Sequence, residues 1–350
     1  MIDSLSKYLA SNDGTDFDFS SLFMDSTCIE LNMHHPIDWV LLKDAVISIM
    51  KSVKTIRRHG LRHRIAPPDG FIKHVNKIAM AISMSKSVRR VDSKKNRKRL
   101  FRELKSVLKV SEAHGHRYMR LLQRDWSKTD LSEKQSEQIS NRLVTVLDQV
   151  DTIIHQAHER IIGERKMHNR DKVLSLYQNH AKVYKRGKAG ADVEFGLQLF
   201  IAENQDGLIV NWNIHDDVPR HDSKFVKPCL DQLKEVDLKP LSVCGDRGFW
   251  TKKVCDVLSK DNVENFICPK DRTLLQSQLQ KENFRTAANR RSQTEARIGI
   301  LKNNFLGGHL STKGFEQQKV QVGWAILAHN LWVAARKMIV VDDPPLAIAA

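Results

Sequence analysis

The chain has 350 residues, of which 57 are Lys or Arg and 41 are Asp or Glu, so its formal net charge is +16. This length suffices for two domains or for one domain with a large insertion, and the basic excess indicates a polyanionic partner, either nucleic acid or an acidic membrane surface. No window approaches the roughly 18 apolar residues of a membrane-spanning helix, and the N-terminus lacks an apolar signal-peptide segment. The sequence therefore argues against an integral membrane protein and predicts a cytoplasmic protein with access to DNA.

The first predicted element is a strand over residues 22–31, whose sequence LFMDSTCIEL is apolar and β-branched. Asp25 lies inside this strand. A carboxylate there is costly unless it is paired or bound to metal. The alternative is a solvent-facing residue on an edge strand, and the strand alone does not decide between the two.

Residues 38–180 are predicted to be mostly helical, because apolar residues recur at helical spacing through much of this region. The Pro- and Gly-containing stretch at residues 66–70 interrupts the helical pattern once. The Ser-Lys-Thr-Asp sequence at 127–130 is expected to cap a new helix.

The positive charge is concentrated in residues 51–105, which hold 18 Lys or Arg and three acidic residues, a net charge of +15. So many uncompensated cations favour contact with DNA phosphates, although a solvated helical face is the alternative. The densest run, KKNRKR at 94–99, supplies the residues that we expect to bind the DNA backbone: Lys94, Lys95, Arg97, Lys98 and Arg99.

From residue 193 the apolar pattern changes to that of strands and short helices. Residues 193–203 and 208–215 predict a hairpin with Gly207 in its turn. A helix is expected at about 222–235, with Asp222 as its N-cap, and Asp216 and Asp217 are assigned to turns. Short strands at 241–244 and 265–269 each precede a helix, the second of which begins near Asn289. A last apolar helix covers about 320–338, with Trp324 in the core.

Without the helical region, the predicted order is three strands followed by alternating helices and strands. This order is typical of an α/β fold with a ribonuclease-H-like mixed sheet, into which a large, mainly helical segment is inserted after the first strand. We expect four segments: an N-terminal lead with the first strand (1–35), the basic helical insertion (36–190), the remainder of the ribonuclease-H-like core (191–338) and a C-terminal tail (339–350).

Two more carboxylates occupy positions that suit a site. Asp246 follows the strand at 241–244 between Gly245 and Gly248, which allow a sharp turn at the carboxyl edge of the sheet; an ordinary turn is an equally good interpretation. Glu295 shares one helical stripe with Arg291 and Lys302, although a surface Arg–Glu pair would have the same spacing.

Taken together, these segments resemble the DDE transposases of bacterial insertion sequences, in the cut-and-paste superfamily. FMDSTCIELNMHHPID resembles the first catalytic strand of that family, and CGDRGF resembles the block that holds its second catalytic Asp. Arg291, Glu295 and Lys302 have the spacing of the third block, and GWAILAHNLWVAARK resembles the closing helix. Three ordered blocks are much more specific than any one of them.

The resemblance implies that Asp25, Asp246 and Glu295 are catalytic and bind two Mg²⁺ ions, for which Mn²⁺ would substitute. It also implies that Arg291 and Lys302 contact phosphates at the transposon ends, and that Arg247 does the same or braces the site. The expected reaction is cleavage at the insertion-sequence ends by water, followed by attack of the freed 3′-OH on target DNA.

The resemblance further implies double-stranded DNA as partner, a homodimer on paired ends, and association with the bacterial nucleoid. Family members usually carry a long helical region before the first catalytic strand, whereas 24 residues precede Asp25 here, so we expect an N-terminally shortened form. Two alternatives remain open. The first is a catalytically silent, DNA-binding transposase remnant, and the second is a metal-dependent nuclease without strand transfer.

Overall fold

The structure, a computed structural model, describes residues 17–85, 90–185, 193–217 and 219–342. The chain divides into two compact units. The helical unit is Met33–Asn179, and the sheet unit combines Met1–Asn32 with His180–Ala350. The insertion expected over residues 36–190 overlaps the helical unit, whose C-terminal boundary lies before the first strand that follows it. Within the described ranges, no helix combines the length and the apolar character needed to span a bilayer.

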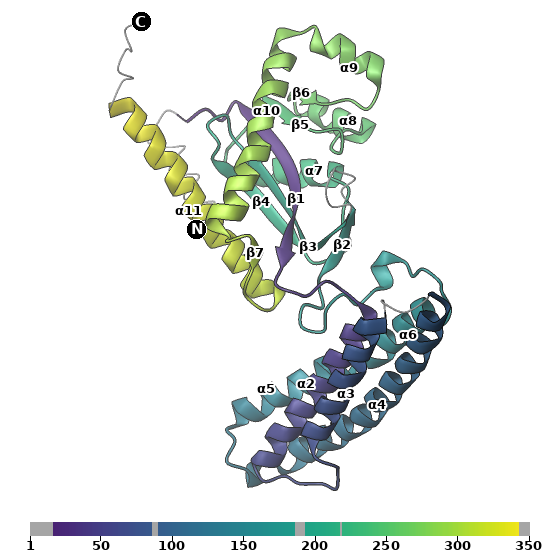
Figure 1. Cartoon of the computed structure of the whole chain (residues 1–350). Coiled ribbons are helices and arrows are strands. Elements are labelled where there is room, and N and C mark those ends of the chain that lie inside the picture. Colours follow the sequence, from purple (N-terminus) through teal and green to yellow (C-terminus); the bar gives the residue numbers. More distant parts are fainter. Residues whose placement is uncertain (1–16, 86–89, 186–192, 218, 343–350) are drawn as a thin grey trace, which may run out of the picture. The chain divides into compact units, whose positions relative to one another are not determined.

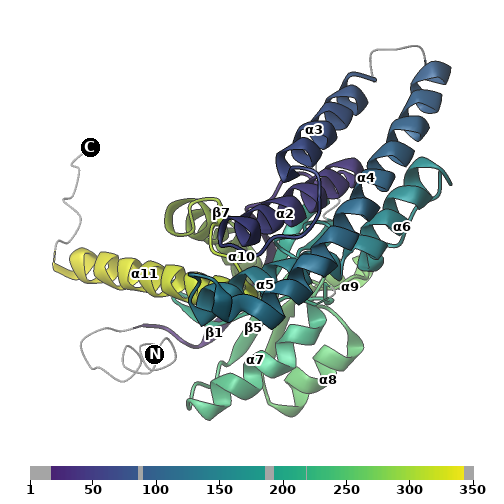
Figure 2. The same cartoon turned by 90° about the horizontal axis from the view of Figure 1, so that it is seen from below.

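The helical unit is built around its first helix, α2, which contacts each of the four other α-helices of the unit. On α2, Leu42, Val46, Ile49 and Val53 recur at intervals of three and four and are fully buried, as expected for a helix with one apolar face. In Figures 1 and 2, α2, α3 and α4 lie side by side. The bounds are α2 (Asp38–Arg58), α3 (Pro68–Met84), α4 (Arg90–Asp125), η2 (Trp126–Lys128), α5 (Glu133–Leu147), α6 (Val150–Ile161) and η3 (Asn169–Asp171).

The cap of α5 differs from the prediction. The helix begins after Ser132, whose hydroxyl accepts a hydrogen bond from the Gln135 backbone N–H, while the Gln135 side chain accepts one from the Ser132 backbone. This reciprocal capping box satisfies two amide groups at the helix start. Residues 127–130, where the cap was expected, form the end of η2 and a turn instead.

The sheet unit contains a seven-stranded mixed sheet with helices on both faces. Its elements, in chain order, are β1 (Ser21–Leu31), β2 (Lys182–Lys185), β3 (Val193–Glu203), β4 (Ile209–His215), α7 (Ser223–Glu235), β5 (Ser242–Gly245), α8 (Lys252–Lys260), β6 (Glu264–Ile267), α9 (Arg272–Leu279), α10 (Glu282–Ile300), η4 (Leu301–Phe305), β7 (His309–Leu310) and α11 (Phe315–Asp342).

Strand β1 lies in the middle of this sheet. It pairs antiparallel with β3 on one edge and parallel with β5 and β7 on the other. Beyond these, β3 pairs antiparallel with β2 and β4, and β5 pairs parallel with β6. Strand β5 runs parallel to β1 and ends at Gly245, which is paired with Met24, so the residue that follows β5 lies next to the middle of β1.

Alternation along β1 sends its side chains to opposite faces of the sheet. Leu22 and Met24 are buried against α7 and α8, two helices that pack side by side (Figure 2). Phe23 is buried on the other face against Ala287 of α10, the helix that crosses β1 in Figure 1. Asp25 shares the face of Phe23, so α10 covers the side of the sheet that carries it.

The predicted strand at 22–31, the hairpin with Gly207 at φ 95° and the helix at 222–235 are confirmed. The sheet has two further short strands, β2 and β7, which the sequence analysis did not predict, and α9 was also missed. Helix α10 begins at Glu282 rather than near Asn289, and α11 extends from Phe315 to Asp342, so the tail expected from 339 begins as helix. Trp324 was expected in the core and is instead 58% exposed.

Candidate active site

Asp25 and Asp246 are neighbours across two parallel strands. The register pairs Met24 of β1 with Gly245 of β5, the last residue of that strand. Met24 is followed by Asp25, and Gly245 is followed by Asp246. Both carboxylates line one open, polar pocket of about 550 Å³. Two residues 221 positions apart in the sequence are brought together by this single register.

A tight turn fixes the direction of Asp246. The Gly248 N–H donates to Asp246 Oδ1 at 2.8 Å, and the Phe249 N–H donates to the Asp246 carbonyl at 3.2 Å. Phe249 is buried, so the turn is anchored to the core directly after the carboxylate. This is an Asx-type turn, in which the side chain of the first residue closes the bend.

Glu295 and Arg291 reach the same pocket from α10, which lies across β1. They are four residues apart and so lie on one side of the helix. The pocket is thus lined by the three acidic residues that the sequence analysis had singled out, together with one of the predicted cations. The full lining consists of Asp25, Ser26, Thr27, Cys28, Tyr184, Gln198, Pro219, Arg220, Asp222, Asp246, Arg291, Glu295 and Ile298.

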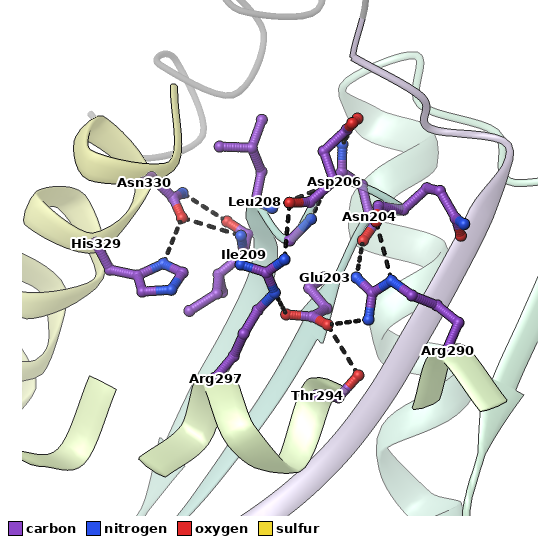
Figure 3. A network of polar contacts seen from close by, with 12 residues as sticks. Glu203, Asn204, Asp206, Leu208, Ile209, Arg290, Thr294, Arg297, His329 and Asn330 are labelled. Atoms are coloured by element: carbon purple, nitrogen blue, oxygen red, sulfur yellow. Dashed lines mark hydrogen bonds and ion pairs between the residues drawn. The ribbon is translucent and has the colours of Figure 1, made fainter. Parts of the chain in front are cut away.

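A buried network of polar side chains sets the rotation of α10 (Figure 3). Arg290 donates to Glu203 Oε1 at 2.9 Å and to the Gln205 and Asn204 carbonyls at 3.0 Å each, and Thr294 donates to Glu203 Oε1 at 2.8 Å. Arg297 lies 3.3 Å from Glu203 Oε2. Glu203 is fully buried, so its negative charge is tolerated only because these partners compensate it.

The network also fixes which side of α10 faces the pocket. Arg290, Thr294 and Arg297 form one stripe of α10 that faces the β3–β4 turn, and the adjacent stripe carries Arg291 and Glu295. Because the first stripe is held by Glu203, the second cannot rotate away from β1. The sequence analysis did not identify this network, since a buried Arg is recognised only when its carboxylate partner is known.

Burial raises the pKa of Asp25 to about 6. A hydrogen bond from the Ser26 backbone N–H, 2.7 Å from Oδ1, opposes this rise. The negative charges of Asp246 and Glu295 add to it, and the positive charge of Arg291 lowers the pKa. The carboxylates of the pocket thus repel one another, and an additional positive charge would be stabilised among them.

This pKa predicts a pH dependence of stability in the metal-free protein. Below about pH 4 Asp25 is protonated in both the folded and the unfolded states, so it contributes nothing. Above about pH 6 it is ionised in both, and the folded state bears the cost of the raised pKa, on the order of 2 to 3 kcal/mol. We therefore expect Asp25→Asn to stabilise the protein relative to wild type at pH 7 and to have a much smaller effect at pH 4, measured by urea unfolding.

The exposed Asp256 of α8 provides the control for this measurement. Asp256→Asn makes the same chemical change at an exposed position of the same unit, and its effect is measured at both pH values for comparison. If the difference between Asp25→Asn and wild type did not depend on pH, the raised pKa of Asp25 would be wrong.

Comparison with known families agrees with this geometry. Residues 167–331 match the family model of the transposase DDE domain. Over this range, which is a little under half of the chain, the protein is similar to a transposase DDE domain. Among curated proteins and among solved structures, no match was found. The matched range includes Asp246, Arg291 and Glu295, whereas Asp25 lies outside it, on the strand that forms the middle of the same sheet.

Two of the cations predicted to contact phosphates, Lys302 and Arg247, are not among the residues that line the pocket. Lys302 lies in η4, the π-helical turn that follows α10, and its ammonium group donates to the Cys28 carbonyl of β1 at 2.9 Å. Arg247 is exposed in the turn after Asp246. Lys302 thus ties the end of α10 to β1 at Cys28, three residues after Asp25.

The five cations expected to contact DNA lie on α4 of the helical unit and differ in their surroundings. Lys94 and Lys98 form ion pairs with Glu164 at 2.9 and 3.0 Å, and Arg99 lies 3.8 Å from Glu103. Lys95 is exposed, and neither it nor Arg97 has an acidic partner within the described ranges. Part of the basic run is therefore neutralised within the protein.

The acidic residues of the pocket suit a divalent cation in their chemistry. Hard cations such as Mg²⁺ prefer carboxylate oxygens, and Asp246 and Glu295 place negative charge around Asp25 that Arg291 offsets only in part. Across residues 17–85, 90–185, 193–217 and 219–342, however, no three His, Cys, Asp or Glu side chains are arranged to hold a metal ion. The residues present thus supply suitable ligands, but their side chains would have to move together to bind one ion.

Proposed function

We propose that this protein is a DNA transposase, which performs metal-dependent cleavage and strand transfer at the ends of an insertion sequence. The observation that carries the proposal is the register of β1 against β5, which makes Asp25 and Asp246 neighbours, in a pocket that Glu295 also lines. The match of residues 167–331 to the transposase DDE domain supports the same reaction class.

The strand order is consistent with a ribonuclease-H-like core. The central strand β1 pairs antiparallel with β3 and parallel with β5, β3 continues into the hairpin with β4, and β6 extends the parallel side. This is the order expected for three antiparallel strands followed by two parallel ones with crossover helices. We propose this fold for the sheet unit, with the helical unit inserted after β1.

In the proposed reaction, Asp25, Asp246 and Glu295 bind two divalent cations, Mg²⁺ or Mn²⁺. Such ions would activate the attacking oxygen and stabilise the leaving oxygen of the scissile phosphate. Arg291, which lines the pocket, would contact a phosphate of the transposon end. Arg247 and Lys302 remain candidates for further phosphate contacts, and Lys302 would then have to share its ammonium group with the Cys28 carbonyl.

The test is cleavage of a labelled duplex that carries the ends of the insertion sequence, identified as inverted repeats in the DNA flanking the gene. We expect new 3′-OH ends in the presence of Mg²⁺ or Mn²⁺ and none in EDTA, followed by joined products with a target plasmid. Retention of the duplex without cleavage would favour the catalytically silent remnant. Cleavage without joined products would favour a nuclease.

We further propose that the helical unit contributes part of the DNA-binding surface. The support is its concentration of Lys and Arg, together with Lys95 and Arg97 of α4, which lack an acidic partner within the described ranges. Cations that contact phosphates release counterions from the duplex, which makes binding depend steeply on salt.

This proposal predicts the effect of a double substitution, Lys95→Gln with Arg97→Gln. If both residues contact phosphates, the slope of log K against log salt concentration should become shallower by about 0.9 for each lost contact, in fluorescence-anisotropy titrations. Lys227→Gln, which removes an exposed cation of α7 in the sheet unit, is the matched control and should leave the slope unchanged. An unchanged slope in the double variant would remove these two residues from the interface.

A homodimer on paired DNA ends is proposed from the family resemblance. One surface of the sheet unit is suited to a subunit contact, because α11 exposes apolar side chains at intervals of four and seven residues, namely Val320, Trp324, Leu331 and Met338. Sedimentation of the purified chain over a range of concentrations tests this, and a monomer at all concentrations, with and without DNA, would contradict it.

A further inference from the structure

Asp222 is a fourth acidic residue in the pocket, and its side chain does not cap the helix that begins after it. It is the N-cap residue of α7, where an Asp side chain ordinarily accepts a hydrogen bond from the first turn of the helix. No such capping bond is present. Instead, Asp222 Oδ1 accepts a hydrogen bond from the Ser26 hydroxyl of β1 at 2.5 Å. The predicted N-cap position of Asp222 is confirmed, but the side-chain hydrogen bond expected of an N-cap is absent.

Ser26 links Asp222 to Asp25. The Ser26 backbone N–H donates to Asp25 Oδ1 at 2.7 Å, while its hydroxyl donates to Asp222. Ser26 therefore holds the Asp25 carboxylate through its backbone N–H, and its own hydroxyl is held by the Asp222 carboxylate.

Asp222 also packs against the turn that carries Asp246. A methyl group added to Gly248 would overlap with Asp222 Oδ2 and would lie 3.0 Å from Asp246 Oδ1. Only a glycine leaves room for the Asp222 carboxylate to approach this turn so closely. Because the Gly248 N–H holds Asp246 Oδ1, Asp222 touches the support of the second carboxylate as well.

The loop before Asp222 is fixed to the sheet. The Gln198 side chain of β3 donates to the Arg220 carbonyl at 3.0 Å and accepts from the Arg220 N–H at 2.8 Å. Gln198 is buried, so this pair of hydrogen bonds anchors the loop two residues before Asp222. The position of the Asp222 carboxylate is thus determined from β3 and β1 together.

We propose that Asp222 is a positioning residue, which through Ser26 and Gly248 fixes the backbone segments that carry Asp25 and Asp246, so that these two carboxylates can close on divalent cations. The inference rests on the proposed function of these two aspartates. It adds a residue outside the set of Asp25, Asp246 and Glu295. It predicts that metal affinity depends on the Asp222 oxygen that accepts from Ser26 and not on the negative charge of Asp222.

The experiment measures the dissociation constant of Mn²⁺ for the full chain without DNA, by isothermal titration calorimetry. Losing a partner that orients a metal ligand weakens metal affinity by about 10- to 100-fold, and this is expected for Asp222→Ala and for Ser26→Ala. Asp222→Asn keeps an oxygen that can accept from Ser26 and should remain close to wild type. Because both act through one hydrogen bond, the Asp222→Ala and Ser26→Ala losses should not add in the double variant.

Two comparisons keep the outcomes distinct. Urea unfolding without metal shows whether a variant is folded, and if Asp222→Ala is not, Ser26→Ala and Asp222→Asn carry the test. Wild-type Mn²⁺ affinity in both Asp222→Ala and Ser26→Ala would overturn the proposal, and so would a loss in Asp222→Asn as large as in Asp222→Ala. If Asp246→Asn also bound Mn²⁺ like wild type, the proposed function itself would fail. If Asp246→Asn lost Mn²⁺ binding while Asp222→Ala and Ser26→Ala kept it, only the role of Asp222 would fail.

Discussion

Asp246→Asn is expected to lower the rate of metal-dependent DNA cleavage by about 10³-fold or more. Metal ions at such a site supply several kcal/mol of charge stabilisation, and about 4 kcal/mol corresponds to a 10³-fold change in rate. Asn keeps the oxygen that accepts the Gly248 N–H, so the turn after β5 should be preserved while the negative charge is removed. The measurement is the appearance of 3′-OH ends on a labelled duplex under single-turnover conditions.

Asp256→Asn serves as the control, since Asp256 is exposed on α8, in the same unit and away from the residues that line the pocket. Its cleavage rate should equal that of wild type. If Asp246→Asn cleaved as fast as the control, Asp246 would not be catalytic and the assignment of the pocket as an active site would have to be abandoned.

The second large effect concerns stability. Arg290→Met should lower the free energy of unfolding by about 3 to 5 kcal/mol, because it leaves the buried Glu203 carboxylate with one of its cationic partners removed. Arg290 also packs its guanidinium over the Phe23 ring, 4.5 Å from the centroid, and holds the carbonyls of Asn204 and Gln205. Urea denaturation followed by circular dichroism measures the loss.

Lys227→Met is the matched comparison, because it makes the same kind of change in an exposed i,i+4 pair with Asp231. Exposed pairs contribute about 1 kcal/mol or less. Replacing both Glu203 and Arg290 by apolar residues should cost less than Arg290→Met alone, since no uncompensated carboxylate remains buried. Equal losses in Arg290→Met and Lys227→Met would show that the network of Figure 3 does not hold α10 in place.

Some parts of this molecule could be predicted from local sequence. The strand of Asp25 is an apolar, β-branched run, the hairpin has a glycine at φ 95° in its turn, and the turn of Asp246 lies between two glycines. In each case residues close together in the chain determine the conformation, and alternation or turn chemistry identifies it. The pairing of β1 with β5 could be expected only from the order of the elements along the chain and from the family resemblance, because nothing in either strand specifies the other.

Other parts depend on partners far away in the chain. The first turns of α10, which were missed, bury Phe284 and Ala287, and Ala287 packs against Phe23 of β1, which lies far away in the chain. The capping role given to Asp222 follows the local preference of helix starts, but Ser26, 196 residues away, provides the hydrogen bond instead. Trp324 lies in an apolar helix, yet α11 has an outward face that periodicity alone cannot distinguish from an inward one.

The central place of β1 has a consequence for how the protein folds. Every strand that β1 pairs with follows the helical unit in the chain, so its pairings span more than 160 residues, whereas the helices of that unit contact one another over shorter separations. Proteins with distant pairings fold slowly, and domains form in the order in which they leave the ribosome. The helical unit should therefore fold first during synthesis, while β1, an apolar strand with two unpaired edges, stays open to aggregation until β3 and β5 emerge.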